Sequence, residues 1–336
     1  MFGTETSPET ISSLTRRATL KLAGGALLTA AIGGMALPSP ARNRPSRIYA
    51  AAPPIDFDKD PVKIERIADN LHVIFGPGGN IAVLTDANGA LLVDCGVPSR
   101  SADVIRAVKK LTPKPIHTLI NTHWHDDHTG GNAVLGKAGA RIIAQANTRK
   151  RLSTDQVVEF MGMKSPAHPS IALPSVTFED NATVYAANQE IALSHVDPAH
   201  TDTDIIVFFK EMNVLHAGDL LFNGFYPFID YSSGGWIGGM VAASNRILSE
   251  ANAQTRIIPG HGPLGTKDDV QRFRDMLDAV QTNIEPMVTA GKSVDEVIAA
   301  KPTAEYDAKW GGFLFNGDQF TRLVYTGIAK HNAAKI

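Results

Sequence analysis

The sequence has little cysteine, little net charge and no internal repeat, and these shortages already narrow its function. Its 336 residues include a single cysteine, Cys95, so no disulfide can form within the chain. Its 32 Lys and Arg residues against 34 Asp and Glu leave a formal charge of −2. That balance lacks the basic surface on which nucleic-acid binding depends. We therefore expect no nucleic-acid partner.

Long, strongly apolar runs are also lacking, and the weakly apolar run Leu22 to Leu37 is rich in Gly and Ala. It follows Thr15-Arg16-Arg17-Ala18-Thr19-Leu20-Lys21, which resembles a twin-arginine export signal. We therefore expect residues 1–40 to be a signal segment and residues 41–60 a Pro-rich linker. A transmembrane anchor is the alternative, since about 18–20 apolar residues span a bilayer.

An export signal carries expectations about partners and location. The twin-arginine machinery becomes an expected partner, and the periplasm or the cell exterior the expected location. Cleavage in the Pro38 to Ala41 region or at Ala50-Ala51-Ala52 would leave no stable membrane association.

The rest of the chain, residues 61–336, has patterns typical of one folded domain. The apolar run Ile116 to Ile120 indicates a buried strand, and Ser101 to Leu111 carries apolar residues at helical spacing. Alternation of strands and helices implies a sheet covered by helices. From Thr266, a helix-capping residue, apolar positions at three-four spacing predict a helical C-terminal region.

Ligand-type side chains gather directly after the expected strand Ile116 to Ile120. Three imidazoles and a carboxylate fall within six residues, at His123, His125, Asp127 and His128. Imidazole and carboxylate together suit zinc or another borderline divalent ion. Alternate positions point the same way off an extended loop, while the last two turn toward a neighbouring point. The spacing therefore favours two adjacent metal centres over one four-ligand cage.

This stretch resembles the His-x-His-x-Asp-His signature of the metallo-β-lactamase superfamily. Further ligand types follow in the order of that family, at His200, Asp219 and His261, each closing a strand-like segment. Scattered surface histidines are the alternative interpretation. The resemblance implies an α/β (α+β) fold, a four-layer αββα sandwich with additional C-terminal helices.

The resemblance also implies two ions with one shared carboxylate: His123, His125 and His200 for the first, Asp127, His128 and His261 for the second, and Asp219 as the bridge. Three protein ligands per ion leave room for water, which is typical of catalytic rather than structural zinc. A hydroxide shared by two zinc ions would attack a carbonyl carbon, with Asp127 orienting it. Because a carboxylate bridge is a harder ligand than thiolate, iron and manganese are alternatives to zinc.

The substrate, a small molecule, stays open between classes. Where β-lactamases of one subclass carry Cys and Lys, this chain has Asp219 and Phe222, so it resembles the glyoxalase II and lactonase branches. The expected export, in contrast, places it where β-lactams act. We take a β-lactam-like amide ring as the first choice and a lactone or thioester as the alternative. A diiron oxidoreductase would have Glu at His125, and a non-catalytic metal-binding protein would show gaps in the ligand set.

Four features near these motifs have more than one interpretation. Ser153 to Pro174 is either a lid over the site or a linking excursion. The aromatic stretch Phe222 to Phe228 either walls a pocket or belongs to the core. Asp94 either supports the metal loops, as in the family, or is a turn residue. Cys95 is expected to be a small buried hydrophobe rather than a ligand.

Overall fold

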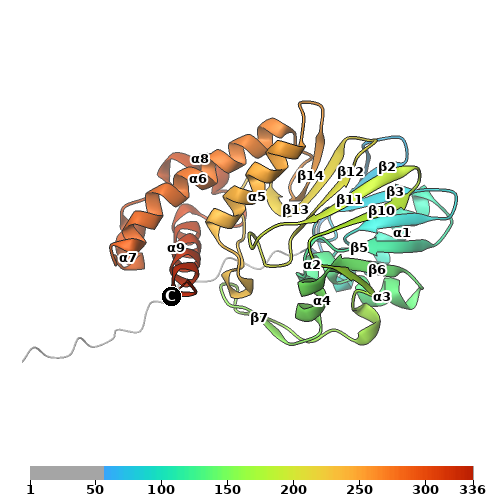
Figure 1. Ribbon diagram of the computed structural model, residues 1–336, viewed down its shortest axis with the longest axis horizontal. Coiled ribbons are helices and arrows are strands. Elements are labelled where there is room, and N and C mark those ends of the chain that lie inside the picture. The colour runs from blue at the N-terminus through green and yellow to red at the C-terminus, as the bar shows by residue number, and fades with distance from the viewer. Residues whose placement is uncertain (1–56, 336) are drawn as a thin grey trace, which may run out of the picture. The chain divides into compact units, whose positions relative to one another are not determined.

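Two β-sheets pack face to face and helices cover their outer faces in the computed structural model (Figure 1). The structure describes residues 57–335. The expected signal segment, residues 1–40, lies outside these residues, as does the linker up to residue 56. Within the described part of the chain no helix has the length and apolar character needed to cross a membrane.

The first sheet has seven strands in the order β1-β2-β3-β4-β5-β6-β9. Its strands are β1 (Lys63–Arg66), β2 (Leu71–Phe75), β3 (Ile81–Thr85), β4 (Ala90–Val93), β5 (Ile116–Ile120), β6 (Arg141–Gln145) and β9 (Val176–Phe178). Pairing is antiparallel from β1 to β4 and parallel from β4 to β9. Between the parallel strands run the helices α1 (Ser101–Leu111), α2 (Asp126–Thr129), α3 (Asn132–Lys137) and α4 (Ala146–Leu152), and the 3-10 turns η1 (Pro98–Arg100) and η2 (Ser170–Ala172).

The second sheet has five strands in chain order. These are β10 (Asn181–Ala186), β11 (Gln189–His195), β12 (Ile205–Phe209), β13 (Val214–Phe222) and β14 (Arg256–His261). All neighbours are antiparallel except β13 and β14, whose parallel pairing requires the crossover helix α5 (Ile237–Glu250), which follows the turn η3 (Tyr231–Ser233).

Three apolar clusters hold the layers together. Between the sheets, Leu91 and Ile120 of the first pack with Leu193 and Val207 of the second. Helix α1 buries Val104 and Val108 against the outer face of the first sheet. Helices α5, α6 and α9 cover the outer face of the second. The expected four-layer α/β sandwich is therefore present.

The C-terminal region is helical from residue 267, as the sequence predicts. It comprises α6 (Lys267–Thr289), α7 (Val294–Ala299), α8 (Ala304–Trp310) and α9 (Gly317–Ala333). Helix α6 begins at a capping box, in which the Thr266 hydroxyl accepts from the Asp269 backbone N–H. Figure 1 shows these helices grouped on one side of the sheets, beside α5.

Two local structures differ from the sequence patterns. Strand β13 continues to Phe222, so Asp219 lies within a strand rather than at its end. Register shifts between β13 and β14 on either side of Gly218 break the regular pairing there. The irregular segment Ser153 to Pro174 contains a short hairpin, β7 (Gln156–Val158) paired with β8 (Met163–Ser165).

Candidate metal centre

All seven predicted ligand residues meet at one end of the two sheets. They form two groups whose ligand atoms lie within 4.8 Å of one another: His123, His125, His200 and Asp219 in one, and Asp127, His128 and His261 in the other. The contributing segments are the loop after β5, helix α2, the loop after β11, and strands β13 and β14. Residues far apart in sequence thus form one site, which scattered surface histidines would not do.

The first group is tightly packed and buried. Nδ1 of His125 lies 2.9 Å from Nε2 of His200. The Asp219 carboxylate oxygen Oδ2 lies 3.4 Å from Nε2 of His200 and 3.8 Å from Nε2 of His123. Three imidazoles and one carboxylate oxygen therefore surround one small volume.

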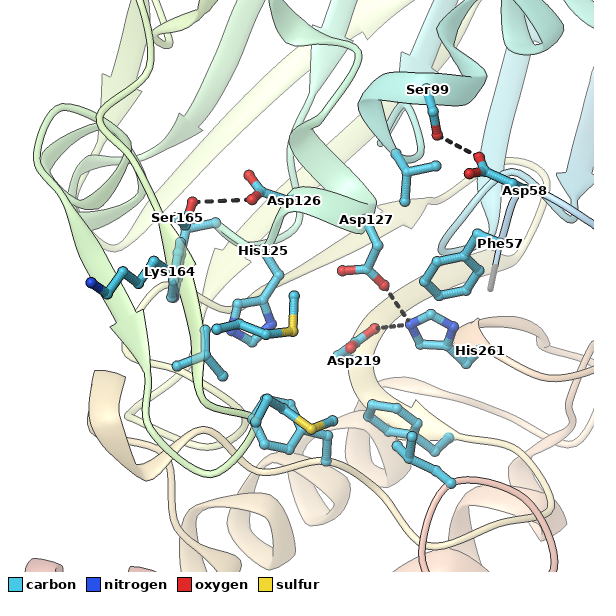
Figure 2. A pocket seen from close by; sticks show the side chains of 18 residues that line it. Phe57, Asp58, Ser99, His125, Asp126, Asp127, Lys164, Ser165, Asp219 and His261 are labelled. Atoms are coloured by element: carbon cyan, nitrogen blue, oxygen red, sulfur yellow. Dashed lines mark hydrogen bonds and ion pairs between the residues drawn. The ribbon is translucent and has the colours of Figure 1, made fainter. Parts of the chain in front are cut away.

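The second group shares the same Asp219 carboxylate through its other oxygen. Oδ1 of Asp219 lies 3.0 Å from Nε2 of His128 and 3.5 Å from Nε2 of His261. Asp127 Oδ2 lies 3.1 Å from His261 Nε2. Figure 2 shows Asp127, Asp219 and His261 pointing toward one another. Asp219 thus lies between the groups, with one oxygen directed at each.

Hydrogen bonds on the outer side of the cluster decide which nitrogen of each histidine faces inward. His128 Nδ1 lies 2.7 Å from an Asp94 oxygen, His200 Nδ1 2.8 Å from the Phe228 carbonyl, and His125 Nε2 3.2 Å from Asp230. A carboxylate or carbonyl oxygen can only accept, so each of these outer nitrogens donates. The other ring nitrogen of each neutral imidazole then presents a lone pair to the cluster.

Two of the inward-facing atoms lack a hydrogen-bond partner among the described residues. His123 Nε2 and Asp219 Oδ1 are buried without a hydrogen bond. The lone pairs of His125 and His200 face each other across 2.9 Å. Buried polar groups are almost always satisfied, so this arrangement is suited to binding a cation. The donor set of imidazoles and carboxylates fits divalent zinc, iron or manganese.

Without a cation, burial and the neighbouring charges shift the site's ionisation. Burial lowers the pKa of His200 to about 4 and, more strongly than the opposing Asp219 charge, that of His123 well below its usual value. Burial acts in the same direction on His261, but the carboxylates of Asp219 and Asp127 outweigh it and raise its pKa to about 9. Metal binding must therefore displace a proton from His261.

Asp94 supports the metal loop, which the sequence left undecided. Its carboxylate accepts hydrogen bonds from the Thr122 backbone N–H at 2.8 Å and the Thr122 hydroxyl at 2.7 Å, in addition to the one from His128. It is fully buried and adopts a positive φ of 65°, which is uncommon for a residue other than glycine. Cys95 is buried, as expected, and its thiol donates to the His128 backbone carbonyl and to Asn132 Oδ1. It belongs to neither group of ligand residues.

Asp230 is the residue that sequence reasoning missed. It is 2 % exposed, and its carboxylate accepts from His125 and from the hydroxyls of Ser232 and Ser233. Burial opposes its ionisation, but these hydrogen bonds hold the pKa of Asp230 below its usual range. The only sequence signal for this role is the turn Asp230-Tyr231-Ser232-Ser233, in which serines follow an Asp, and that pattern is common.

Two glycines allow close approach to the site. A side chain at Gly79 would collide with the His128 ring, and one at Gly260 would collide with Oδ1 of Asp219. The backbone on both sides of the cluster therefore packs directly on ligand-type side chains.

A mainly apolar cavity of about 580 Å³ opens onto the cluster. Phe222 and Phe228 both line it, so the aromatic stretch does form part of a pocket wall, while Tyr226 belongs to the core. The Phe222 ring stacks on His261 with centroids 5.2 Å apart. The hairpin β7–β8 contributes a second wall through Val158, Met161 and Met163, so this part of the segment Ser153 to Pro174 lies on the substrate side of the site.

The fold and the clustered histidines are those of a metal-dependent hydrolase family. A family model described as the metallo-beta-lactamase superfamily matches residues 75–285, more than half of the chain. The chain therefore belongs to the metallo-β-lactamase superfamily.

Individual relatives are distant. The chain is similar to metallo-beta-lactamase IND-1 of Chryseobacterium indologenes, with 23 % identity over 224 residues, covering 63 % of this chain and 85 % of that protein. It is also similar to metallo-beta-lactamase type 2 of Bacillus cereus, with 22 % identity over 199 residues, 59 % of this chain and 72 % of that protein. Both are named as metallo-β-lactamases.

Solved structures share the fold. A metallo-beta-lactamase from Pontibacter korlensis superimposes with a TM-score of 0.53 at 17 % identity, covering 65 % of this chain and 99 % of that one. The DIM-1 metallo-beta-lactamase gives 0.52 at 19 % identity, with 66 % and 99 % covered. At these identities the likeness establishes the αββα sandwich.

Proposed function

We propose that this protein is a dinuclear zinc-dependent hydrolase that cleaves a carbonyl substrate with activated water. One ion would be held by His123, His125 and His200, the other by Asp127, His128 and His261, with Asp219 shared. The observation that carries the proposal is the inward convergence of unpaired acceptors, above all His123 Nε2 and Asp219 Oδ1. Divalent ions there would lower the pKa of water to about 7 and polarise the substrate carbonyl.

The protein's own residues then have separate tasks. Asp127 lines the cavity from the first turn of α2, and its carboxylate can accept a hydrogen bond from the attacking water. In the metal-free site, charges of His128 and His261 outweigh its burial and hold the pKa of Asp127 at about 2. Asp94 and Asp230 keep His128 and His125 oriented. The apolar walls limit the access of bulk water.

Two substrate classes have specific support. The names of the curated relatives favour a β-lactam ring, as the expected export also does. The carboxylate of Asp219 at the shared position, and Phe222 in place of a substrate-binding lysine, favour a lactone or thioester. We propose hydrolysis of the bond between the carbonyl carbon and its leaving group in one of these classes. The apolar walls of the cavity favour a lactone or thioester.

The direct test is a parallel assay of the zinc-loaded mature protein with a chromogenic β-lactam, a lactone and a thioester. Turnover that disappears with a chelator and returns with zinc is expected for at least one of them. Metal analysis should find about two ions per chain. Turnover of the β-lactam alone would reject the lactone and thioester class, and no turnover of any would reject the hydrolase proposal.

Removing a ligand tests the roles of individual residues. His123→Ala and Asp127→Ala should each lower turnover at least about a thousandfold, because each opens one ion's ligand set. Circular dichroism should remain that of the parent protein. Near-normal activity in either folded variant would contradict the assigned roles.

We also propose that the protein is exported by the twin-arginine machinery to the periplasm or beyond. The support is the motif at Arg16 and Arg17 followed by a weakly apolar run. Fractionation of cells expressing the full chain should find it outside the cytoplasm. The Arg16→Lys, Arg17→Lys double variant should be retained inside, and equal export of both proteins would refute this route.

A further inference from the structure

The wall formed by the hairpin β7–β8 is apolar on the side that faces the cavity. Val158 pairs with Met163, and Val157 pairs with Lys164. Because paired residues lie on one face and successive residues on opposite faces, Val158 and Met163 share the cavity face. Val157 and Lys164 belong to the other face, although Lys164 still borders the cavity. Figure 2 shows the ammonium group of Lys164 pointing away from Asp127 and His261.

The opposite wall comes from the second sheet and the C-terminal region. Phe222 and Phe228 line it together with Leu314 from the turn before α9. Both phenylalanines are largely buried, so they are fixed in place by the core behind them. The cavity thus has two apolar walls, with the ligand cluster between them.

The hairpin is tied to the metal loop, so its wall is part of the site. The Ser165 hydroxyl donates to one Asp126 oxygen at 3.1 Å, and His168 Nε2 donates to the other at 3.0 Å. Asp126 lies between two predicted ligands, His125 and Asp127. Phe160 of the hairpin turn also packs edge-on against Phe315, with centroids 5.6 Å apart.

Away from the cluster, the described part of the lining has no inward-pointing cation that could pair with a negative charge. Lys164 is the only lysine or arginine among the described residues that line the cavity, and its ammonium points away. The carboxylates of Asp58 and Asp126 also line the cavity. Burying an unpaired charge between the walls would oppose binding, whereas each methylene buried there would favour it.

We propose that the substrate carries an uncharged apolar arm beside its scissile carbonyl, and that this arm lies between the hairpin residues Val158, Met161 and Met163 and the wall of Phe222, Phe228 and Leu314. The inference rests on the proposed hydrolase function and adds the substrate class. The substrate is then a neutral, amphiphilic lactone or thioester rather than an anionic ring.

The test uses a series of lactones that share one ring and carry alkyl arms of increasing length, from methyl to heptyl. A further lactone has the same ring and an arm that ends in a carboxylate. With zinc-loaded protein, kcat/KM should rise about two- to fourfold per added methylene until the cavity is filled. The carboxylate-terminated lactone should react at least about tenfold more slowly than its neutral counterpart of equal length.

A matched pair of variants locates the arm. Met163 and Val157 are similarly exposed, at 54 % and 52 %, and lie on opposite faces of one hairpin. Met163→Glu should reduce the ratio of kcat/KM for the heptyl and methyl lactones about tenfold. Val157→Glu should leave this ratio as in the parent. Equal effects of the two substitutions would overturn the proposed position of the arm.

Measuring the affinity of the same lactones for zinc-loaded protein by calorimetry distinguishes failure of the proposed arm from failure of the proposed hydrolase function. Affinity that rises with arm length without any turnover would retain the arm and reject lactone hydrolysis. Turnover that is independent of arm length, or faster for the carboxylate-terminated lactone, would reject the arm and retain the hydrolase. If the lactones neither bind nor turn over, both the arm and the hydrolase proposal would be rejected.

Discussion

Asp230 orients His125 from a position 105 residues away in the sequence. Its carboxylate holds the outer nitrogen of His125, and the inner nitrogen faces His200. Asp94 acts on His128 in the same way. At the scale of single residues, the geometry of the site thus depends on carboxylates that do not themselves face the cluster.

We expect Asp230→Asn to weaken zinc binding about 10- to 100-fold, because an amide can present its NH₂ to His125 and so favour the wrong tautomer. The measurement is zinc affinity by competition with a chromophoric chelator. Asp197→Asn, an exposed Asp three residues before His200, is the matched control and should bind zinc normally. Unchanged affinity in Asp230→Asn would exclude this orienting role.

The buried carboxyl of Asp204 should make the stability of the protein depend on pH. Burial raises the pKa of its carboxyl from 3.8 to about 7, although Thr201 donates to it through its hydroxyl and backbone N–H. A carboxyl with a raised folded pKa binds its proton more tightly in the folded state. Its contribution to stability is therefore present below about pH 4 and is lost as the pH rises toward about 7.

Asp204→Asn removes this titration, so its unfolding free energy relative to the parent should increase as the pH rises between these values. Urea unfolding of chelator-treated protein at several pH values measures the difference. Comparing the two proteins cancels the titration of the buried histidines, which both share. A difference that stays constant with pH would contradict the raised pKa of Asp204.

At the scale of elements, the hairpin β7–β8 and helix α2 form a unit through Asp126. Asp126→Ala removes both hydrogen bonds to the segment and leaves the seven predicted ligands unchanged. We expect KM to rise about tenfold with a smaller change in kcat, because the hairpin wall loses about 1–2 kcal/mol of attachment. Faster amide exchange across residues 156–165 should accompany it.

Asp155→Ala is the control for this variant, because Asp155 accepts a hydrogen bond from Ala167 within the same segment and does not contact α2. It should leave KM near that of the parent. Metal content is measured for both proteins, and a loss of zinc in Asp126→Ala would show that Asp126 acts on the ligand loop rather than on the hairpin.

At the scale of the whole molecule, the C-terminal helices belong to the core that supports the site. Phe320 of α9 is fully buried and stacks on Tyr226 with centroids 4.3 Å apart. Tyr226 lies in the segment that joins Phe222 to Phe228, so α9 is linked directly to one wall of the cavity.

Phe320→Ala should therefore destabilise the protein by about 3–5 kcal/mol, the usual range for an aromatic side chain removed from a core. Urea unfolding measures this loss. Phe313→Ala is the control, since Phe313 is 64 % exposed, and it should cost far less. Equal stability of the two variants would mean that α9 is dispensable to the core.

The sequence by itself determined the ligand types, their order and most of the elements. His123, His125, Asp127 and His128 are close in sequence, so their proximity follows from the loop after one strand. The helix cap at Thr266 is equally local, and so was predicted. The alternation of strands and helices indicated a sheet covered by helices, because it reflects which faces are buried. The four-layer sandwich was implied by the resemblance to the metallo-β-lactamase superfamily.

Only the tertiary structure decided what depends on contacts between distant segments. Asp230 became an orienting residue because the loop after β13 returns to the cluster. The bulged register of β13 and β14 placed Asp219 inside a strand yet between both groups. The cavity likewise has walls from the hairpin, the second sheet and the C-terminal region. No local pattern encodes such a meeting, because it is set by how the layers pack.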